Sequence, residues 1–592
     1  MTTTWSDSTA EARLRSSISL VEPWGFVELC AGLTRLSGSA DERRAIDHLV
    51  ERLRSWGVSY ELHEPEVYIS WPLAASVTAH EATGVVQQYT AKTPAMSRPT
   101  GSSPVSGPPV YLPTAQASGA EDVFELGLGP VDPALVAGRV VVTEGFAAPT
   151  KVAEIQALGG IAAVFISPGQ RIHESICTPI WGSPDLDSDD QRPRLPVASV
   201  NRADGEALAA AISAGRVERL AVVTDLETRW RPIPVLVAEI PGTEEPDRFV
   251  LLHGHLDSWH VGIGDNAVGD AALLELARVF ALHPPRRSLR IAWWSGHSHG
   301  RYAGSTWYAD AFALDLMEHC VAHLNCDSPG CRWADTFDHL ETTAEAWPLA
   351  ETAVRDASGI AATWERPVRA GDYSFMNLGL SAAFMLSSTM TDATRQRHDY
   401  YAVGGCGGNI AWHTEDDTIE IADREYLQRD IGVYAVAASR LLNAPLIPLD
   451  FRRTVAAYTA TLDRYATVAG DRFDFSPAQS ALAALTIACD LFYDKWEELS
   501  SDPTAREMAN VALLNLSRLL VPIDFARRGP FTQDPAQDVP PLPDLARALS
   551  LPELEPGSHA DRITQHSLMR GQNRVVWALR QATRITEQVA DG

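Results

Sequence analysis

The sequence has few of the features that mark secreted or membrane proteins. Its seven cysteines are scattered over 592 residues and odd in number, which argues against a disulfide framework and suits a reducing compartment. No apolar run approaches the ~20 residues that a transmembrane helix needs. The first residues lack the basic and apolar parts of a signal peptide. We therefore expect a cytoplasmic protein without a membrane partner.

Positive charge is also scarce. The chain carries 49 Lys and Arg residues against 76 Asp and Glu residues, a formal net charge of −27. Such a chain is repelled by nucleic acid and by anionic membranes, so no nucleic-acid partner is expected. The length exceeds what a single hydrophobic core supports, which predicts several domains.

The pattern of predicted strands and helices changes twice along the chain. Strand candidates alternate with helix candidates from residue 231 to 444, which predicts an α/β fold with a mixed, mainly parallel sheet between helices. A Pro-, Ser- and Gly-rich stretch precedes a second group of short strands and helices, which indicates an inserted α/β domain. After Pro445 only long helical patterns remain. The expected domains are 1–85 with 231–444, the insert 86–230, and a helical domain 445–592.

One stretch, LLHGHLDSWHVGIGDNAVGD at Leu251–Asp270, organises the chain. An apolar run ends at His255 and Asp257, and Asp265 precedes a helical pattern. Open α/β sheets keep their chemistry where strands end in Gly-rich turns that lead into helices. Imidazole and carboxylate groups are natural ligands for zinc and similar ions.

Further polar clusters follow other strand candidates. Asp327 lies in HLNCDSPG and His413 in WHTEDDT, and each follows a strand candidate or a Gly-rich loop. A single histidine is more often a core or surface residue than a ligand. Together with His255 and Asp265 they make four such positions, which favours one shared metal site.

With these motifs the sequence resembles the zinc aminopeptidase and glutamate carboxypeptidase family of metallopeptidases, in the branch of the folate hydrolases and the transferrin receptor. GHLDS, GDNA, NCD and HTEDDT occur in the family's order. The resemblance implies one or two zinc ions, and another divalent metal is the alternative. His255 and Asp327 would bind the first metal, Asp265 would bridge, His413 would bind the second, and Asp257 would orient His255. It also implies a protease-associated insert and a C-terminal dimerisation domain, hence a homodimer.

The sequence departs from this family at its Glu-Glu pair, of which one Glu is the general base and the other a ligand. An ungapped alignment places the pair on Ser298 and His299. His299 would then be a metal ligand, while Ser298 lacks useful basicity near neutral pH. His297 is either a proton acceptor or a surface histidine, and Trp412 either donates to the oxyanion or packs.

The stretch after AGDYSF lacks the Arg expected of a glutamate pocket, and aromatic side chains lie near the motifs instead. We expect Trp259, Asp372 and Tyr373 to contact substrate. The predicted function is a metal-dependent hydrolase that cleaves an amide-type C–N bond in a small molecule or short peptide, using metal-activated water. The alternatives are a non-catalytic binding or scaffold protein on the same fold, or a metalloenzyme of another reaction type.

Overall fold

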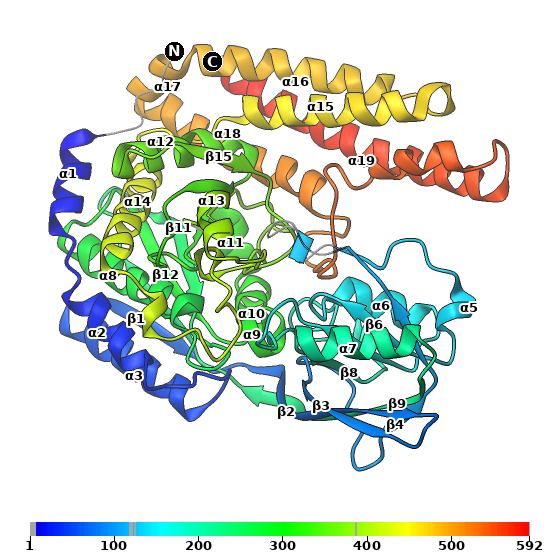
Figure 1. Cartoon of the computed structure of the whole chain (residues 1–592). Coiled ribbons are helices and arrows are strands. Elements are labelled where there is room, and N and C mark those ends of the chain that lie inside the picture. Colours follow the sequence, from blue (N-terminus) through cyan, green and yellow to red (C-terminus); the bar gives the residue numbers. More distant parts are fainter. Residues whose placement is uncertain (1–6, 116, 118–121, 124–125, 385–387, 591–592) are drawn as a thin grey trace.

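The computed structural model describes residues 7–115, 117, 122–123, 126–384 and 388–590. Figure 1 shows three parts: a central body of sheet and helices, a smaller sheet domain at the lower right, and a layer of long helices along the top. The mixed α/β fold predicted from the alternating strand and helix patterns is confirmed.

The central body is built on a six-stranded sheet. Strands β12, β11, β13 and β16 run parallel, whereas β10 and β1 are antiparallel to their neighbours. His255 pairs with Trp294 in the last register position of β11 and β12, so both strands end at one edge of the sheet. The strands in spatial order are β1 (Ser59–His63), β10 (Val235–Ile240), β12 (Arg287–Trp294), β11 (Glu245–His255), β13 (Cys320–Asn325) and β16 (Ala382–Ala383).

Helices cover this sheet. Ser39 caps α3 by accepting a hydrogen bond from the Glu42 amide. Helix α8 follows the Asp265 loop and is buried along most of its length, which explains its run of apolar residues. The helices of the body are α1 (Ser8–Ser17), α2 (Val21–Cys30), α3 (Ala40–Ser55), α8 (Val268–Leu282), α9 (His297–Gly300), α10 (Ala303–Ala311), α11 (Ala313–His319), α12 (Trp347–Ser358), α13 (Asp392–Arg397) and α14 (Arg424–Asn443).

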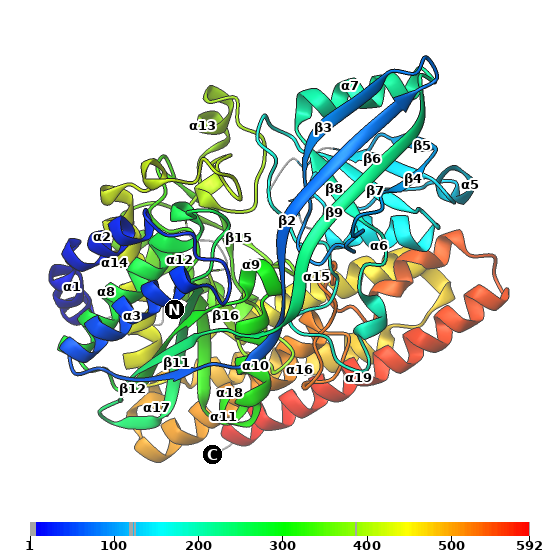
Figure 2. The same ribbon diagram turned by 90° about the horizontal axis from the view of Figure 1, so that it is seen from below.

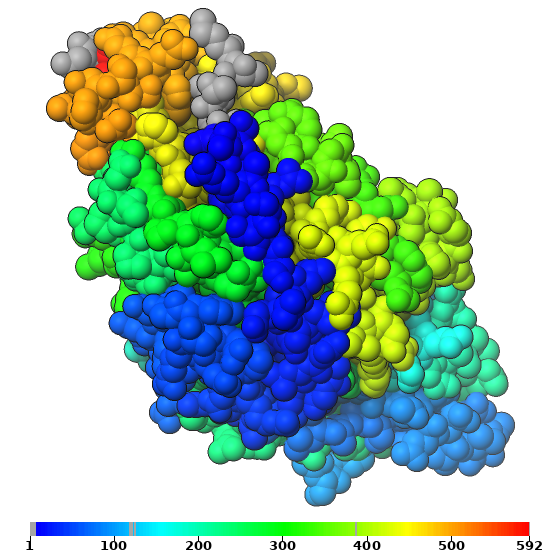
Figure 3. All heavy atoms as spheres, turned by 90° about the vertical axis from the view of Figure 1, so that its left-hand side faces the viewer, coloured from blue at the N-terminus to red at the C-terminus, as the bar shows by residue number. Residues whose placement is uncertain are grey.

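A small parallel pair, β14 (Phe337–Glu341) and β15 (Ala362–Glu365), completes the body. In Figure 3 the N-terminal helices lie over the surface of the body, below the orange C-terminal helices.

The insert is built on an eight-stranded sheet with its own cores. The long strands β2 and β9 pair along nearly their whole length and run from the body to the far end of the insert (Figure 2). The boundary expected at residue 86 is therefore wrong, because β2 already belongs to this sheet from Glu66. The strands in order are β4 (Val105–Gly107), β9 (Val217–Pro232), β2 (Glu66–Glu81), β3 (Val86–Lys92), β8 (Val197–Val200), β7 (Ala162–Ile166), β6 (Val140–Glu144) and β5 (Pro109–Leu112).

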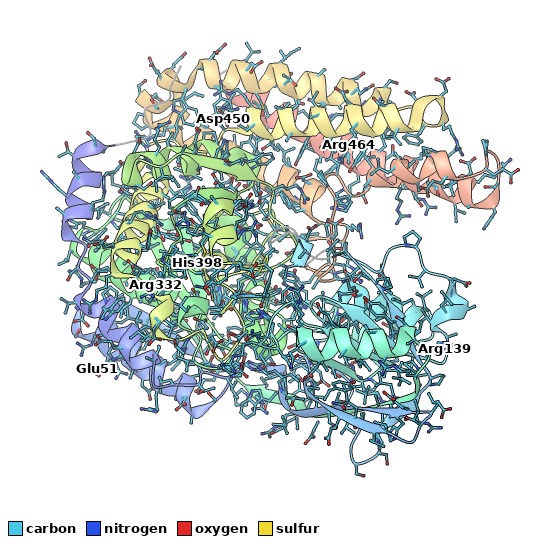
Figure 4. The ribbon with its side chains drawn as sticks, viewed as in Figure 1. Glu51, Arg139, Arg332, His398, Asp450 and Arg464 are labelled. Atoms are coloured by element: carbon cyan, nitrogen blue, oxygen red, sulfur yellow. The ribbon has the colours of Figure 1, made fainter. Side chains whose placement is uncertain are left out.

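Helices α5 (Pro133–Val136), α6 (Pro149–Ala157) and α7 (Arg202–Ser213) pack on this sheet. The last part of the chain is helical, as predicted. Asp450 caps the start of α15, and Arg464 lies further along it (Figure 4). Its helices are α15 (Phe451–Ala469), α16 (Ser476–Asp494), α17 (Trp496–Ser501), α18 (Pro503–Phe525) and α19 (His559–Ala590).

Helix α18 is long and apolar enough, by length and composition, to cross a membrane. However, 61% of its most apolar window is buried inside the protein, as in the core helix of a globular domain.

Candidate metal centre

The edge where the parallel strands end collects the predicted ligands. His255 is the last residue of β11, and Asp327 follows the end of β13 by two residues. Asp265 lies in the loop before α8, and His413 lies in the loop before α14. The sheet topology explains why residues so far apart in the sequence meet.

Asp265 lies between two imidazole rings. One carboxylate oxygen is 3.0 Å from His255 Nε2 and the other is 3.0 Å from His413 Nε2. A carboxylate oxygen of Asp327 lies 3.6 Å from His255 Nε2. The structure thus brings together these four predicted residues, and all of them are largely buried.

The electrostatics of this cluster favour a bound cation. Burial alone lowers the pKa of His255, but hydrogen bonds to Asp265 and Asp327 raise it well above its ordinary value. Burial raises the pKa of Asp265, but His255 and His413 lower it well below its ordinary value. Buried carboxylates require a positive partner, and a divalent metal ion can take that role when the histidines are neutral.

His297 adds a third imidazole. Its ring stacks on that of His255 with centroids 3.7 Å apart and an interplanar angle of 13°. Ligand atoms of His255, His297 and Asp327 all lie within 4.8 Å of one another, close enough to share one ion. The structure therefore places His297 in the site rather than on a surface loop.

The three imidazoles are held in the same way. Nδ1 of His255 lies 2.9 Å from the Asp257 carbonyl oxygen, and Nδ1 of His413 lies 3.0 Å from that of Glu174. Nδ1 of His297 lies 2.9 Å from Oδ2 of Asp372. Because these oxygens can accept a hydrogen bond, each Nδ1 can carry a proton, and each Nε2 is then the ring atom left to bind a metal.

His299 lies outside this cluster, which corrects its prediction as a ligand. Its Nδ1 lies 2.9 Å from Ser37 Oγ and 3.7 Å from an Asp257 oxygen. Burial lowers its pKa, so the ring is neutral near pH 7. Helix α9 is a single turn that starts after Gly296, which has a φ of 77°. Residues two apart on a helical turn point about 200° apart, so His297 and His299 face opposite ways.

Asp257 has a different role from the one expected. Its main-chain carbonyl, rather than its carboxylate, orients His255. The carboxylate accepts hydrogen bonds from the amides of His297 at 3.1 Å and Ser298 at 2.8 Å, and from Ser37 Oγ at 2.8 Å. It fixes the start of α9 and so the position of His297.

Most of the other expected contact residues lie behind the site. Asp372 holds His297 and accepts from Ser305 Oγ at 2.6 Å. Tyr373 is buried in a core cluster with α18 residues, and the Trp259 ring packs 4.3 Å from His299. Of these predicted contact residues, only Trp412 lines the pocket beside the cluster. Its ring stacks on that of His413, with centroids 3.8 Å apart.

The pocket above the cluster is small, about 70 Å³. The charged residues that line it come from the body, and many of the apolar lining residues come from the insert. The insert residues that line it are Val123, Phe146, Ala148, Pro149, Ser175 and Ile176.

The insert also holds the loop that carries His413. The Glu174 amide donates to the His413 carbonyl at 2.8 Å, and the Glu174 carbonyl accepts from the ring. His173 Nδ1 lies 2.6 Å from the Trp412 carbonyl oxygen, and its Nε2 lies 2.6 Å from the Tyr401 hydroxyl. We call residues 173–174 with their partners at 412–413 the clasp. Sequence reasoning missed it, because nothing in the insert resembles a site motif.

Known proteins are similar to parts of this chain. Residues 236–436 match the family model described as peptidase family M28. Mouse aminopeptidase NAALADL1 is 33% identical over 125 residues, 20% of this chain and 16% of that protein. Transferrin receptor protein 1 of Gallus gallus is 34% identical over 105 residues, 17% of this chain and 13% of that protein. The matched stretches span less than a fifth of these relatives' length.

Among solved structures, an aminopeptidase from Aneurinibacillus sp. strain AM-1 covers 73% of this chain and 96% of its own, with a TM-score of 0.53 and 18% identity. A peptidase M28 precursor from Shewanella amazonensis covers 74% of this chain and 96% of its own, with a TM-score of 0.53 and 19% identity. At this identity the similarity shows a shared fold.

Proposed function

Because residues 236–436 match the family model of peptidase family M28, we propose that the protein is a zinc-dependent hydrolase. Its substrate is a short peptide or small molecule with an amide-type C–N bond. The observation that carries this proposal is the set of three histidines whose Nδ1 atoms are all held by oxygen acceptors beside two buried carboxylates. This donor set suits zinc.

One zinc ion fits the cluster of His255, His297 and Asp327. Asp265 extends from this cluster to His413 and could bridge to a second ion. That second position has only these two protein ligands on the described part of the chain, with the Ser298 hydroxyl nearby in the same pocket. We therefore propose one firmly bound ion and a weaker second position.

The protein would contribute to the reaction mainly by holding the imidazole rings in a fixed orientation and by excluding water. A zinc ion supplies Lewis acidity at the substrate carbonyl and lowers the pKa of water. Asp257, Asp372 and the clasp keep the imidazoles in one tautomer and one direction. The apolar insert residues exclude bulk water from the pocket, which strengthens the electrostatic interactions inside it.

His297 has a second candidate role. With Nδ1 tied to Asp372, its Nε2 could accept a proton from water instead of binding metal. The placement of His297 beside His255 supports either role, and the 4.8 Å spacing favours ligation.

We also propose that the protein is a cytoplasmic homodimer, with a protease-associated insert and a dimerisation surface on the C-terminal helices. The seven cysteines, all free and buried, fit a reducing compartment. Exposed apolar side chains on α16, α18 and α19 fit a dimer surface.

The proposed function is tested by assaying purified full-length protein against a panel of short peptides and acyl amino acids. A chelator should abolish hydrolysis, and added zinc should restore it. A protein that holds no zinc and hydrolyses none of the panel would instead support the scaffold alternative, because a scaffold needs no stoichiometric metal.

A further inference from the structure

A buried arginine lines the pocket beside the metal cluster. Arg301 follows α9 directly, and it shares the pocket wall with His297, Ser298, Asp327 and His413. It is the only Lys or Arg among the described residues that line this pocket. Only 6% of its surface is exposed.

The guanidinium group of Arg301 is incompletely paired. Nη2 donates to the carbonyl oxygen of Ile176 in the insert, and the group lies 5.7 Å from the Tyr302 ring centre. Nε is buried without a hydrogen-bond partner. In the described part of the chain, no carboxylate forms an ion pair with it. An unpaired charge so deeply buried is costly, and arginine's planar fork suits a carboxylate.

The backbone of Arg301 is held in an unusual conformation by a contact with the insert. Arg301 and Tyr302 have φ values of 48° and 66°, a conformation that side chains other than glycine rarely adopt. The Gly182 amide of the insert donates to the Arg301 carbonyl at 2.7 Å. Strained residues of this kind persist where the surrounding structure fixes them, and they gather at binding sites.

We propose that Arg301 binds a carboxylate of the substrate. This inference rests on the proposed hydrolase function and deepens it: the substrate is a short peptide or acyl amino acid with a carboxylate in the residue that follows the cleaved bond. The pocket volume of about 70 Å³ corresponds to only a few water sites of about 10–15 Å³ each, so the group beyond that bond is small.

Three non-hydrolysable probes test this on the zinc-loaded full-length protein. Each is an alanyl dipeptide whose cleavable amide is replaced by a reduced methylene-amine bond. The first ends in alanine with a free carboxylate, the second is its C-terminal amide, and the third ends in glutamic acid α-amide, which keeps only a side-chain carboxylate. Calorimetry should show that one carboxylate probe binds about tenfold to a hundredfold more tightly than the neutral amide.

The variant Arg301→Met should abolish this preference while the amide probe binds as before. Arg301→Lys should keep part of it, because lysine is a point charge without the fork. The matched control is Arg171→Met, which removes an exposed insert arginine paired with Asp416 and outside the pocket. It should keep the full preference.

Three results would overturn the inference: equal binding of all probes by the unmodified protein, a preference that survives in Arg301→Met, or no binding at 10 mM probe. If Arg301→Met fails to fold, the inference is judged by two other results: the ratio of carboxylate-probe to amide-probe affinity in the unmodified protein, and the same ratio in Arg301→Lys. Zinc content is measured on the same samples. Zinc with no carboxylate preference refutes Arg301's role alone, whereas absence of zinc refutes the proposed function.

Discussion

At the scale of single residues, two of the predicted ligands lie at strand ends. His255 and Asp327 follow apolar runs that become parallel strands, and topology alone brings them to one edge. Which of His297 and His299 faces the cluster depends on the local backbone conformation. An extended turn would put both rings on one side, but the segment forms a helical turn that separates them.

Ser298 offers the sharpest test of the second metal position. Its hydroxyl is buried without a described hydrogen-bond partner, and it lines the pocket with Asp265 and His413. Ser298→Glu should therefore add a third ligand to these two and raise the zinc content from about one toward two ions per chain. Elemental analysis after dialysis against a fixed free-zinc concentration measures this.

Ser298→Ala is the matched control for that substitution. It removes a hydroxyl that makes no described hydrogen bond, so zinc content and turnover should stay close to those of the unmodified protein. Unchanged zinc content in Ser298→Glu would show that the hydroxyl does not face the second position.

At the scale of elements, the alternating strand and helix patterns predicted the α/β core and the helical last part of the chain, because these patterns depend on nearby residues. The clasp could not be predicted in this way. Its contacts join residues 239 apart in the sequence and run largely through main-chain atoms. The insert boundary was wrong for a related reason: β2 is defined by its pairing with β9, far along the chain.

The clasp predicts that the insert supports metal binding. His173→Phe keeps a ring in place but removes the hydrogen bonds to the Trp412 carbonyl and the Tyr401 hydroxyl. We expect zinc affinity to fall about tenfold, the lower end of what loss of such supporting contacts costs. Competition with a chromogenic chelator measures it.

Tyr401→Phe is the control, because it removes only the outer of the two hydrogen bonds. It should change zinc affinity much less than His173→Phe. Equal zinc affinity in both variants and the unmodified protein would show that His173 does not support zinc binding.

At the scale of the whole molecule, the described residues that line the pocket come from the body and the insert, and none comes from the C-terminal helices. The C-terminal helices expose apolar side chains on their outer surface. Ile487 and Leu491 lie one turn apart on α16 and are 64% and 52% exposed. Such a face suits a protein partner, and the resemblance points to a second copy of this chain.

Sedimentation velocity at micromolar concentration should therefore show a dimer. Replacing both Ile487 and Leu491 by Glu should give a folded monomer, since two buried charges would disfavour the interface. The control is Leu186→Glu in the insert, where a fully exposed leucine is replaced. A monomeric unmodified protein would refute the dimer, and a dimer that survives the double substitution would place the interface elsewhere.

The ligand set proposed for the zinc ion is His297 with His255 and Asp327, without His299. It is tested most directly by the zinc content of three full-length proteins: the unmodified chain, His297→Ala and His299→Ala. We predict about one zinc ion per chain in the unmodified protein and in His299→Ala, and a large loss in His297→Ala. Full zinc content in His297→Ala, or its loss in His299→Ala, would contradict this ligand set.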